Sequence, residues 1–199
     1  YFPEYRPYVE LAGGVLRIVP PDVKAFQIDF DAFEKTLNEK TAAVVVNSPS
    51  NPSGVVFSDA TLKKLAAVLN RKQAEYGHEI FIISDEPYRE IAFDGVKVPY
   101  VSKYYDNTLS CYSFSKSLSI PGDRIGYLAA NPKCRDAKLI AAMCGQISRG
   151  LGHNCPTAFV QLAVAEMLGK TADLSVYETN MNLLYDAFAD MGLECVRPN

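Results

Sequence analysis

The amino-acid sequence predicts an α/β protein, an α-β-α sandwich around a mostly parallel sheet. Short β-branched runs alternate with longer helical patterns along most of the chain, which is typical of parallel sheets with helices on both faces. Several runs are apolar without interruption, as expected for strands buried on both faces. The 199 residues are 48% hydrophobic with a net charge of −3, which fits one globular domain or slightly more.

The first elements are predicted between residues 15 and 47. The apolar run 15–19 predicts a strand. Asp31 and Glu34 have the spacing of a capping box and predict a short helix over residues 31–38. The β-branched run 42–47 predicts a buried strand that stops at a proline-rich turn.

A long helix is predicted after Ser58, whose side chain is a suitable N-cap. Leu62, Leu65, Ala66 and Leu69 recur at the spacing that places them on one helix face. We therefore expect this face to pack against the sheet.

The remaining apolar runs predict three strands and then three helices. The strands are expected over residues 79–84, 108–113 and 124–130. The helices are expected over residues 137–147, 156–168 and 171–191. The composition changes near Lys170, which predicts a domain boundary there, and the run 193–196 would then begin a second domain.

Composition narrows the class of partner. The slight negative charge and the lack of a long Lys/Arg run argue against nucleic acid or a membrane surface, so we expect a small ligand. No apolar stretch approaches the ~20 residues that span a bilayer.

The five cysteines are scattered without C-x-x-C spacing, which predicts reduced thiols in the cytoplasm and no metal site.

Three polar clusters follow predicted strands, where open α/β sheets bind ligands. They are N-S-P-S-N-P-S-G over residues 47–54, S-D-E-P-Y over residues 84–88, and a longer cluster over residues 113–127. Taken singly, each has an ordinary explanation as a turn, a strand end or a solvated loop. Their order and spacing together indicate a ligand site.

In order and spacing these clusters resemble those of class I/II aminotransferases, the fold type I enzymes that use pyridoxal 5′-phosphate (PLP). The string S-x-S-K-x-x-x-x-P-G-x-R-x-G-Y from Ser113 is the most specific part. One departure is Ser53, where the family commonly has Thr. The resemblance implies that residues 1–170 are a partial PLP-binding large domain. Residues 171–199 would be a linking helix and the beginning of a small domain.

The resemblance implies roles for four side chains around the cofactor ring. Lys116 would form the Schiff base with the cofactor aldehyde and then move a proton from the substrate Cα to C4′, and a primary amine suits both tasks. Asp85 would pair with the protonated pyridine nitrogen, where a neighbouring cation would keep its pKa low. Tyr88 and Asn51 would reach the phenolic oxygen of the cofactor.

Further residues are implied around the phosphate and on the outer face of the ring. Ser113, Ser115 and Arg124 match the phosphate-binding positions, and the guanidinium fork of Arg suits a phosphate. Phe2 aligns with the residue that stacks on the pyridine ring. Tyr5 lies near the position that supports the ring-nitrogen carboxylate.

Asn51 and Arg149 are the candidate substrate-binding residues. Arg149 precedes an H-N-C-P string, and in aspartate-type members an Arg before S-N-P-P reaches across a dimer interface to the substrate's distal carboxylate. The alternative for Arg149 is a solvated charge at a helix end. His78 and His153 have no visible partner in the sequence, so we expect surface or capping roles for them.

The resemblance implies an aminotransferase that moves an amino group between an amino acid and a 2-oxo acid and acts as a homodimer. One alternative is a PLP-dependent lyase or synthase of the same fold. Another is an aminotransferase-like sensor domain of a transcription regulator. The chain begins without methionine, and the family's phosphate cup, N-terminal arm and α-carboxylate Arg are expected outside it. We therefore expect a fragment that lacks part of the transamination machinery.

Overall fold

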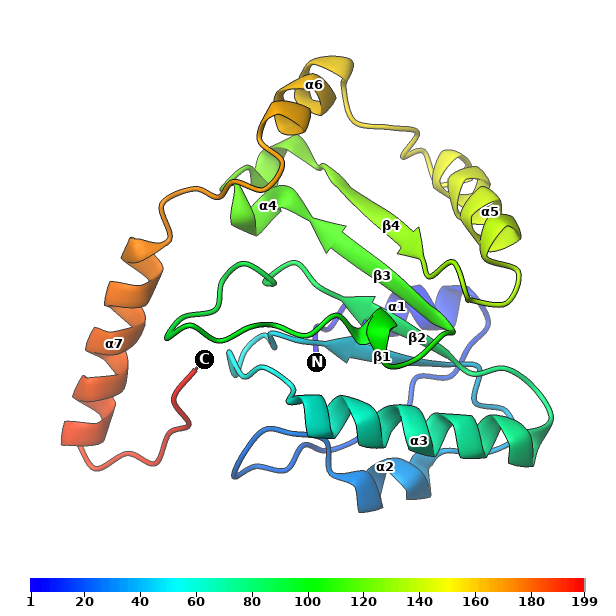
Figure 1. Cartoon of the computed structure of the whole chain (residues 1–199), viewed down its shortest axis with the longest axis horizontal. Coiled ribbons are helices and arrows are strands. Elements are labelled where there is room, and N and C mark those ends of the chain that lie inside the picture. Colours follow the sequence, from blue (N-terminus) through cyan, green and yellow to red (C-terminus); the bar gives the residue numbers. More distant parts are fainter. Residues whose placement is uncertain (199) are drawn as a thin grey trace.

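The computed structural model describes residues 1–198 and contains a four-stranded mixed sheet within that range (Figure 1). The strands follow one another across the sheet in chain order. β1 pairs in parallel with β2, β2 pairs in parallel with β3, and β3 pairs antiparallel with β4. Their bounds are Ala43–Asn47 (β1), Phe81–Asp85 (β2), Thr108–Ser113 (β3) and Gly126–Ala130 (β4). The predicted α/β class with a mostly parallel sheet is confirmed.

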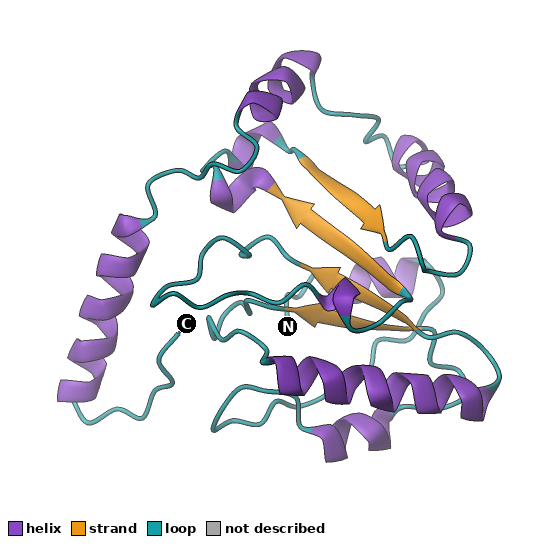
Figure 2. Ribbon diagram, in the orientation of Figure 1, coloured by secondary structure: helices purple, strands orange, loops and turns teal. Residues whose placement is uncertain are grey.

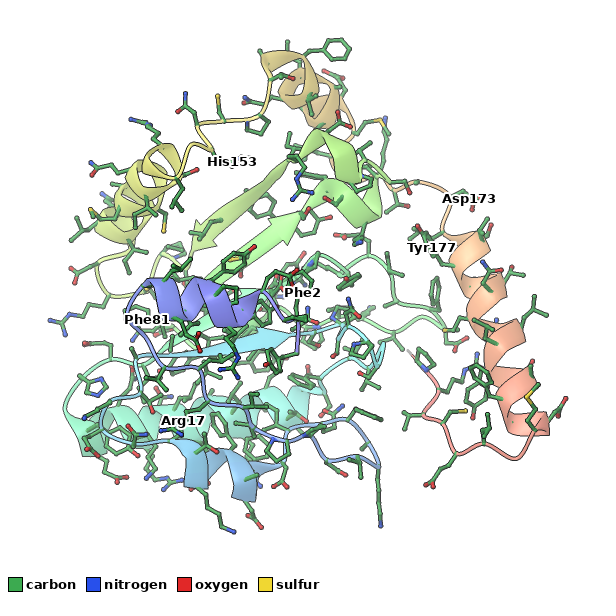
Figure 3. The ribbon with its side chains drawn as sticks, turned by 180° about the vertical axis from the view of Figure 1, so that it is seen from behind. Phe2, Arg17, Phe81, His153, Asp173 and Tyr177 are labelled. Carbon is green, nitrogen blue, oxygen red and sulfur yellow. The ribbon has the colours of Figure 1, made fainter. Side chains whose placement is uncertain are left out.

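The described part of the chain also contains seven α-helices, of which the last stands apart from the sheet (Figure 2). They are α1 (Tyr5–Leu11), α2 (Phe30–Thr36), α3 (Asp59–Tyr76), α4 (Phe114–Ser117), α5 (Ala137–Gly150), α6 (Ala158–Glu166) and α7 (Ser175–Asp190). The front view and the view from behind both place β1 and β2 between α1 and α3 (Figures 1 and 3). None of the described helices combines the length and hydropathy needed to cross a membrane.

The core lies between α3 and the sheet. Ser58 caps α3 by accepting a hydrogen bond from the backbone N–H of Thr61 at 3.1 Å, and Gly77 ends the helix in a left-handed conformation. The predicted apolar face of α3 is buried. The cluster comprises Phe33, Val46, Leu62, Leu65, Ala66, Val68, Leu69, Ile80, Ile82, Val101 and Tyr105.

Two predictions before β1 need correction. Residues 15–19 form no strand, and Val15 and Ile18 remain 74% and 51% exposed, because no described strand lies alongside to pair with this run. The short helix begins at Phe30, and its cap is Asp29 rather than Asp31. The Asp29 carboxylate accepts the N–H of Ala32 at 3.0 Å, so Asp29 is the N-cap of this helix.

Other differences concern the edge of the sheet and two helices. Four of the five residues of β4 are exposed, so the expectation of strands buried on both faces is wrong for it. Two helices, α1 and α4, were not predicted. The predicted domain boundary near residue 170 stays a prediction.

Candidate active site

The three predicted polar clusters meet at one edge of the sheet. The strands β1 to β3 are parallel, so the loops that follow them leave the sheet on the same side (Figure 1). β4 runs the other way, and its first residue, Gly126, pairs with Ser113 at the end of β3. The start of β4, with Arg124 just before it, therefore lies at this same edge.

Asp85 ends β2 and is half-buried. The hydroxyl of Tyr5, from α1, donates a hydrogen bond to its Oδ2. Burial raises the pKa of the Asp85 carboxyl, the Tyr5 hydrogen bond opposes that rise, and the charge of Glu86 adds to it. Burial and the neighbouring carboxylate also raise the pKa of Tyr5.

The sequence analysis predicted a low pKa for Asp85 on the condition that a cation lies beside it. None of the described residues forms an ion pair with this carboxylate, so desolvation determines the direction of the shift in the chain alone. Oδ1 accepts no hydrogen bond from the described residues. Asp85 therefore retains an acceptor for a group from outside the chain.

Asn51, Tyr88 and Lys116 come together from two loops and the short helix α4. The side-chain Nδ2 of Asn51 donates to the hydroxyl of Tyr88 at 3.0 Å. The Nζ atom of Lys116 lies 5.8 Å from the centroid of the Tyr88 ring. Asn51 and Lys116 are exposed and Tyr88 is half-buried, so all three can be reached from solvent.

Ser113 and Ser115 form a tight turn at the start of α4. The Ser113 hydroxyl accepts the backbone N–H of Ser115 at 3.2 Å and donates to the Ser115 hydroxyl at 2.7 Å. Arg124 is exposed, and its Nη1 donates to the carbonyl of Pro121 at 2.9 Å. The rest of the Arg124 guanidinium makes no hydrogen bond with the described residues. Several of its donors thus remain for a ligand.

Gly126 permits the close approach of β4 to this turn. A Cβ atom at this position would overlap the carbonyl oxygen of Tyr112 and lie 3.1 Å from the Cα of Ser113. Only glycine fits here without moving one of the two strands. This overlap explains why the second glycine of the motif, Gly126, occupies its position.

Two candidates lie outside this group. Phe2 is 50% exposed and packs edge-on against Tyr5, with 6.0 Å between ring centroids (Figure 3). Arg149 is exposed in the last turn of α5, and its side chain forms no hydrogen bond or ion pair with the described residues. The structure of this chain places Arg149 apart from the other candidates.

Two residues beside the site, Asn47 and Glu86, were not assigned a role from the sequence. The side chain of Asn47 contacts the backbone of both Asn51 and Asp85. Glu86 is buried, accepts the Ser84 hydroxyl at 2.6 Å and forms an ion pair with Arg89. Two sequence patterns could have identified them: an Asn at the end of an apolar strand, and an acidic residue three positions before an arginine.

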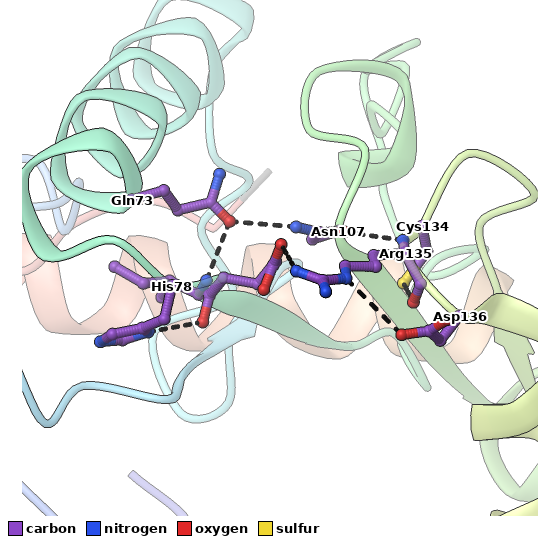
Figure 4. Close-up of polar contacts among 8 residues, drawn as sticks. Gln73, His78, Asn107, Cys134, Arg135 and Asp136 are labelled. Atoms are coloured by element: carbon purple, nitrogen blue, oxygen red, sulfur yellow. Dashed lines mark hydrogen bonds and ion pairs between the residues drawn. The ribbon is translucent and has the colours of Figure 1, made fainter.

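A second polar network lies at the opposite edge, before β2 and β3 (Figure 4). The Nδ1 and Nε2 atoms of His78 lie 3.0 Å and 2.9 Å from the carbonyl oxygens of Glu79 and Glu39. The carboxylate of Glu79 forms an ion pair with Arg135. His78 thus fastens two loops together, which is a structural role consistent with the prediction.

The cavities described in the chain are elsewhere. One of about 650 Å³ lies at the N-terminus of α3, with Asp59, Tyr100 and Lys103 in its lining, and another of about 350 Å³ adjoins His78. Neither contains a candidate residue of the site. The candidate site is therefore defined by the chemistry of its residues and by their contacts.

The whole chain, residues 1–199, matches the family described as aminotransferase class I and II. An aromatic-amino-acid aminotransferase of Thermococcus litoralis is 30% identical over 99% of this chain and 50% of its own length. An aspartate aminotransferase of Bacillus subtilis is 31% identical over 100% of this chain and 50% of its own length. The chain spans about half the length of these curated relatives.

Solved structures agree with this match. An amino transferase from Eubacterium rectale is 48% identical, with a TM-score of 0.96 over 100% of this chain and 50% of that one. The aspartate aminotransferase of Thermus thermophilus with maleate is 27% identical, with a TM-score of 0.80 over 100% of this chain and 51% of that one.

Proposed function

The chain belongs to the class I and II aminotransferase family, and we propose that it is the PLP-binding part of an enzyme that moves an amino group between an amino acid and a 2-oxo acid. The family is PLP-dependent. The observation that carries the proposal is the meeting of Asn51, Tyr88 and Lys116 beside the end of β2, which bears Asp85.

The donors and acceptors at this edge fit the polar groups of the cofactor ring. Asp85 offers Oδ1, an acceptor suited to a protonated ring nitrogen. Asn51 Nδ2 and the Tyr88 hydroxyl lie 3.0 Å apart and can both donate to a phenolic oxygen. Lys116 supplies the primary amine that an aldehyde requires.

The groups at the start of α4 and β4 fit a phosphate. Ser113 and Ser115 contribute hydroxyls, and Arg124 contributes a cation with unused donors. A phosphate pairs with guanidinium through short, charge-assisted hydrogen bonds. We assign this end of the site to the phosphate, and we assign the exposed face of Phe2 to the ring.

When bound, PLP supplies an electron-withdrawing ring that stabilises negative charge at the substrate α-carbon. Asp85 would hold the proton on the ring nitrogen, and the positive charge there would offset the cost of burying its carboxylate. Lys116 would take the proton from the substrate α-carbon. Tyr88 and Asn51 would orient the ring by holding its phenolic oxygen.

We also propose the division of the chain at residue 170 into a partial large domain and the start of a small domain. The last helix, α7, has no fully buried residue, which supports its assignment as a linking helix. The proposed enzyme would be a homodimer, and Arg149 is exposed for contact with a second subunit or its substrate.

The proposal is tested on the full-length protein incubated with PLP. Borohydride reduction followed by peptide mass spectrometry should place a phosphopyridoxyl group on Lys116, and Lys116→Ala should abolish it. Lys103→Ala, a change at another exposed lysine, should leave the modification intact. Retention of a reducible lysine-linked cofactor in Lys116→Ala would refute the role.

The reaction is tested by incubating the holoenzyme with pairs of amino acids and 2-oxo acids. Chromatography should show the two products of amino-group exchange in equal amounts. Release of ammonia or of a side-chain fragment without exchange would instead indicate a lyase.

A further inference from the structure

The side chain of Asn47 links the two loops that carry the proposed ring-binding groups. Its Nδ2 donates to the main-chain carbonyl of Asp85 at 3.0 Å, and its Oδ1 accepts the main-chain N–H of Asn51 at 2.8 Å. A carbonyl only accepts and an N–H only donates, so these partners fix the orientation of the amide. Aspartate and leucine match this side chain in shape, but neither carries both a donor and an acceptor.

Asn47 stands where the backbone ladder between β1 and β2 ends. Asn47 and Asp85 are the last paired residues of the two strands, and beyond them the chain leaves the sheet in two separate loops. The amide of Asn47 adds hydrogen bonds past the end of the ladder. It therefore sets the position of the Asn51 loop relative to the end of β2.

The side chains of the two residues that Asn47 contacts, Asn51 and Asp85, belong to the proposed cofactor site. The Asn51 side chain continues to the Tyr88 hydroxyl, and the Asp85 side chain continues to Tyr5. One half-buried amide therefore connects the pair assigned to the phenolic oxygen with the carboxylate assigned to the ring nitrogen.

We propose that Asn47 is a positioning residue that holds the two sides of the cofactor ring site at a fixed separation. The inference rests on the proposed function, because it concerns the same site. Asn47 acts through Asn51 and Asp85 and is not itself assigned a contact with the cofactor.

The test uses Asn47→Asp in the full-length protein, because this change preserves the shape of the side chain. The variant keeps an acceptor for the Asn51 N–H but sets an oxygen against the Asp85 carbonyl, so it loses a donor and adds a charge near Asp85. We expect the dissociation constant of PLP, measured by fluorescence titration of the apoprotein, to rise about tenfold or more. The pH titration of the bound cofactor's absorbance should also shift.

Asn131→Asp is the matched control. Asn131 also bridges two backbone positions, with Nδ2 donating to the Ser102 carbonyl at 2.9 Å and Oδ1 accepting the Lys133 N–H at 3.1 Å. It follows β4 at the opposite edge of the sheet, beside the start of β3. Asn131→Asp should lower thermal stability without changing PLP affinity or the absorbance titration.

A second variant, Asn47→Ala, removes both hydrogen bonds without adding charge and keeps the test valid if Asn47→Asp does not fold. It should weaken PLP binding and speed hydrogen exchange of the Asn51 amide. Variants of Asn47 that bind PLP as tightly as Asn131→Asp would overturn the inference alone. A wild-type protein that binds no PLP would overturn the proposed function and this inference with it.

Discussion

The hydroxyl of Tyr5 donates a hydrogen bond to the carboxylate of Asp85, although 80 positions separate the two residues in sequence. This contact ties α1 to the carboxyl end of β2. A carboxylate that is partly removed from water is costly unless it is hydrogen-bonded, so Tyr5 offsets part of the cost of placing Asp85 there.

Replacing Tyr5 with Phe should remove that compensation. Because hydrogen bonds to charged groups contribute about 1.5–3 kcal/mol, we expect a loss of this size in the free energy of unfolding at neutral pH. The pKa of Asp85 should rise further. Urea denaturation measures the first effect. Tyr8→Phe is the control, because Tyr8 lies on the same helix and is 66% exposed. Equal effects of the two changes would contradict the assignment.

Asp85→Asn should stabilise the cofactor-free protein at neutral pH. The pKa of Asp85 is raised in the folded state, so its contribution to stability is complete below its ordinary pKa and is lost as the pH rises through the folded-state value. Asn carries no charge and avoids this loss. Thermal unfolding without PLP should favour the variant at neutral pH, with the advantage vanishing at acidic pH. A less stable variant at neutral pH would show that burial is not the dominant effect.

His78 should make stability depend on pH. Both ring nitrogens face carbonyl oxygens, and only the protonated ring can donate to both, in agreement with a pKa raised by these hydrogen bonds. The charge of Glu79 acts in the same direction. The contribution is full below the ordinary pKa of His and is lost as the pH rises through the raised value.

The measurement is the midpoint of urea unfolding from acidic to mildly alkaline pH. In the wild type it should fall across the titration of His78, and His78→Asn should flatten that part of the curve. The chain has only one other histidine, His153, and His153→Asn should retain the wild-type dependence. A slope that survives in His78→Asn would assign the dependence to another group.

Two glycine-to-alanine changes should have opposite signs. At Gly126 the added Cβ would overlap the Tyr112 carbonyl, so we expect a loss of about 1–3 kcal/mol from the forced separation of β3 and β4. At Gly145, inside α5, nothing lies within 4 Å of an added Cβ, so alanine should stabilise by roughly 0.5–1 kcal/mol. Chemical denaturation of both variants tests the pair. A neutral effect at position 126 would mean that the strands can part without cost.

The sequence predicted elements well where local and tertiary signals agree. The helix α3 has a capping Ser58 and leucines at helical spacing, and both signals act in the structure. Residues 15–19 show the limit, because an apolar run indicates that a strand is possible but not that a partner strand lies beside it. The helix α1 is only seven residues long, contains Pro7 and has no fully buried residue, so it lacks the combination of local and tertiary signals that marks α3.

The candidate site was also predicted only in part. Its residue types were identified by resemblance to a family, and the parallel strands explain why those residues share one edge of the sheet. The amide bridge of Asn47 could not be predicted, because its two partners are backbone atoms whose positions depend on the register of β1 and β2. The roles of the site residues stay predictions that the experiments above can test.

The hydrogen-bonded order of the strands also constrains ligand size. The end of β2, with Asp85, and the end of β3, with Ser113, belong to neighbouring strands, which lie about 4.8 Å apart in any sheet. Substitutions in the loops can change which chemical groups meet a ligand there. They leave the register of β2 and β3 unchanged, in which Asp85 pairs with Cys111 and Ser113 lies two residues further along, so the backbone constrains the separation of the two ends of the site and the loops determine its chemistry.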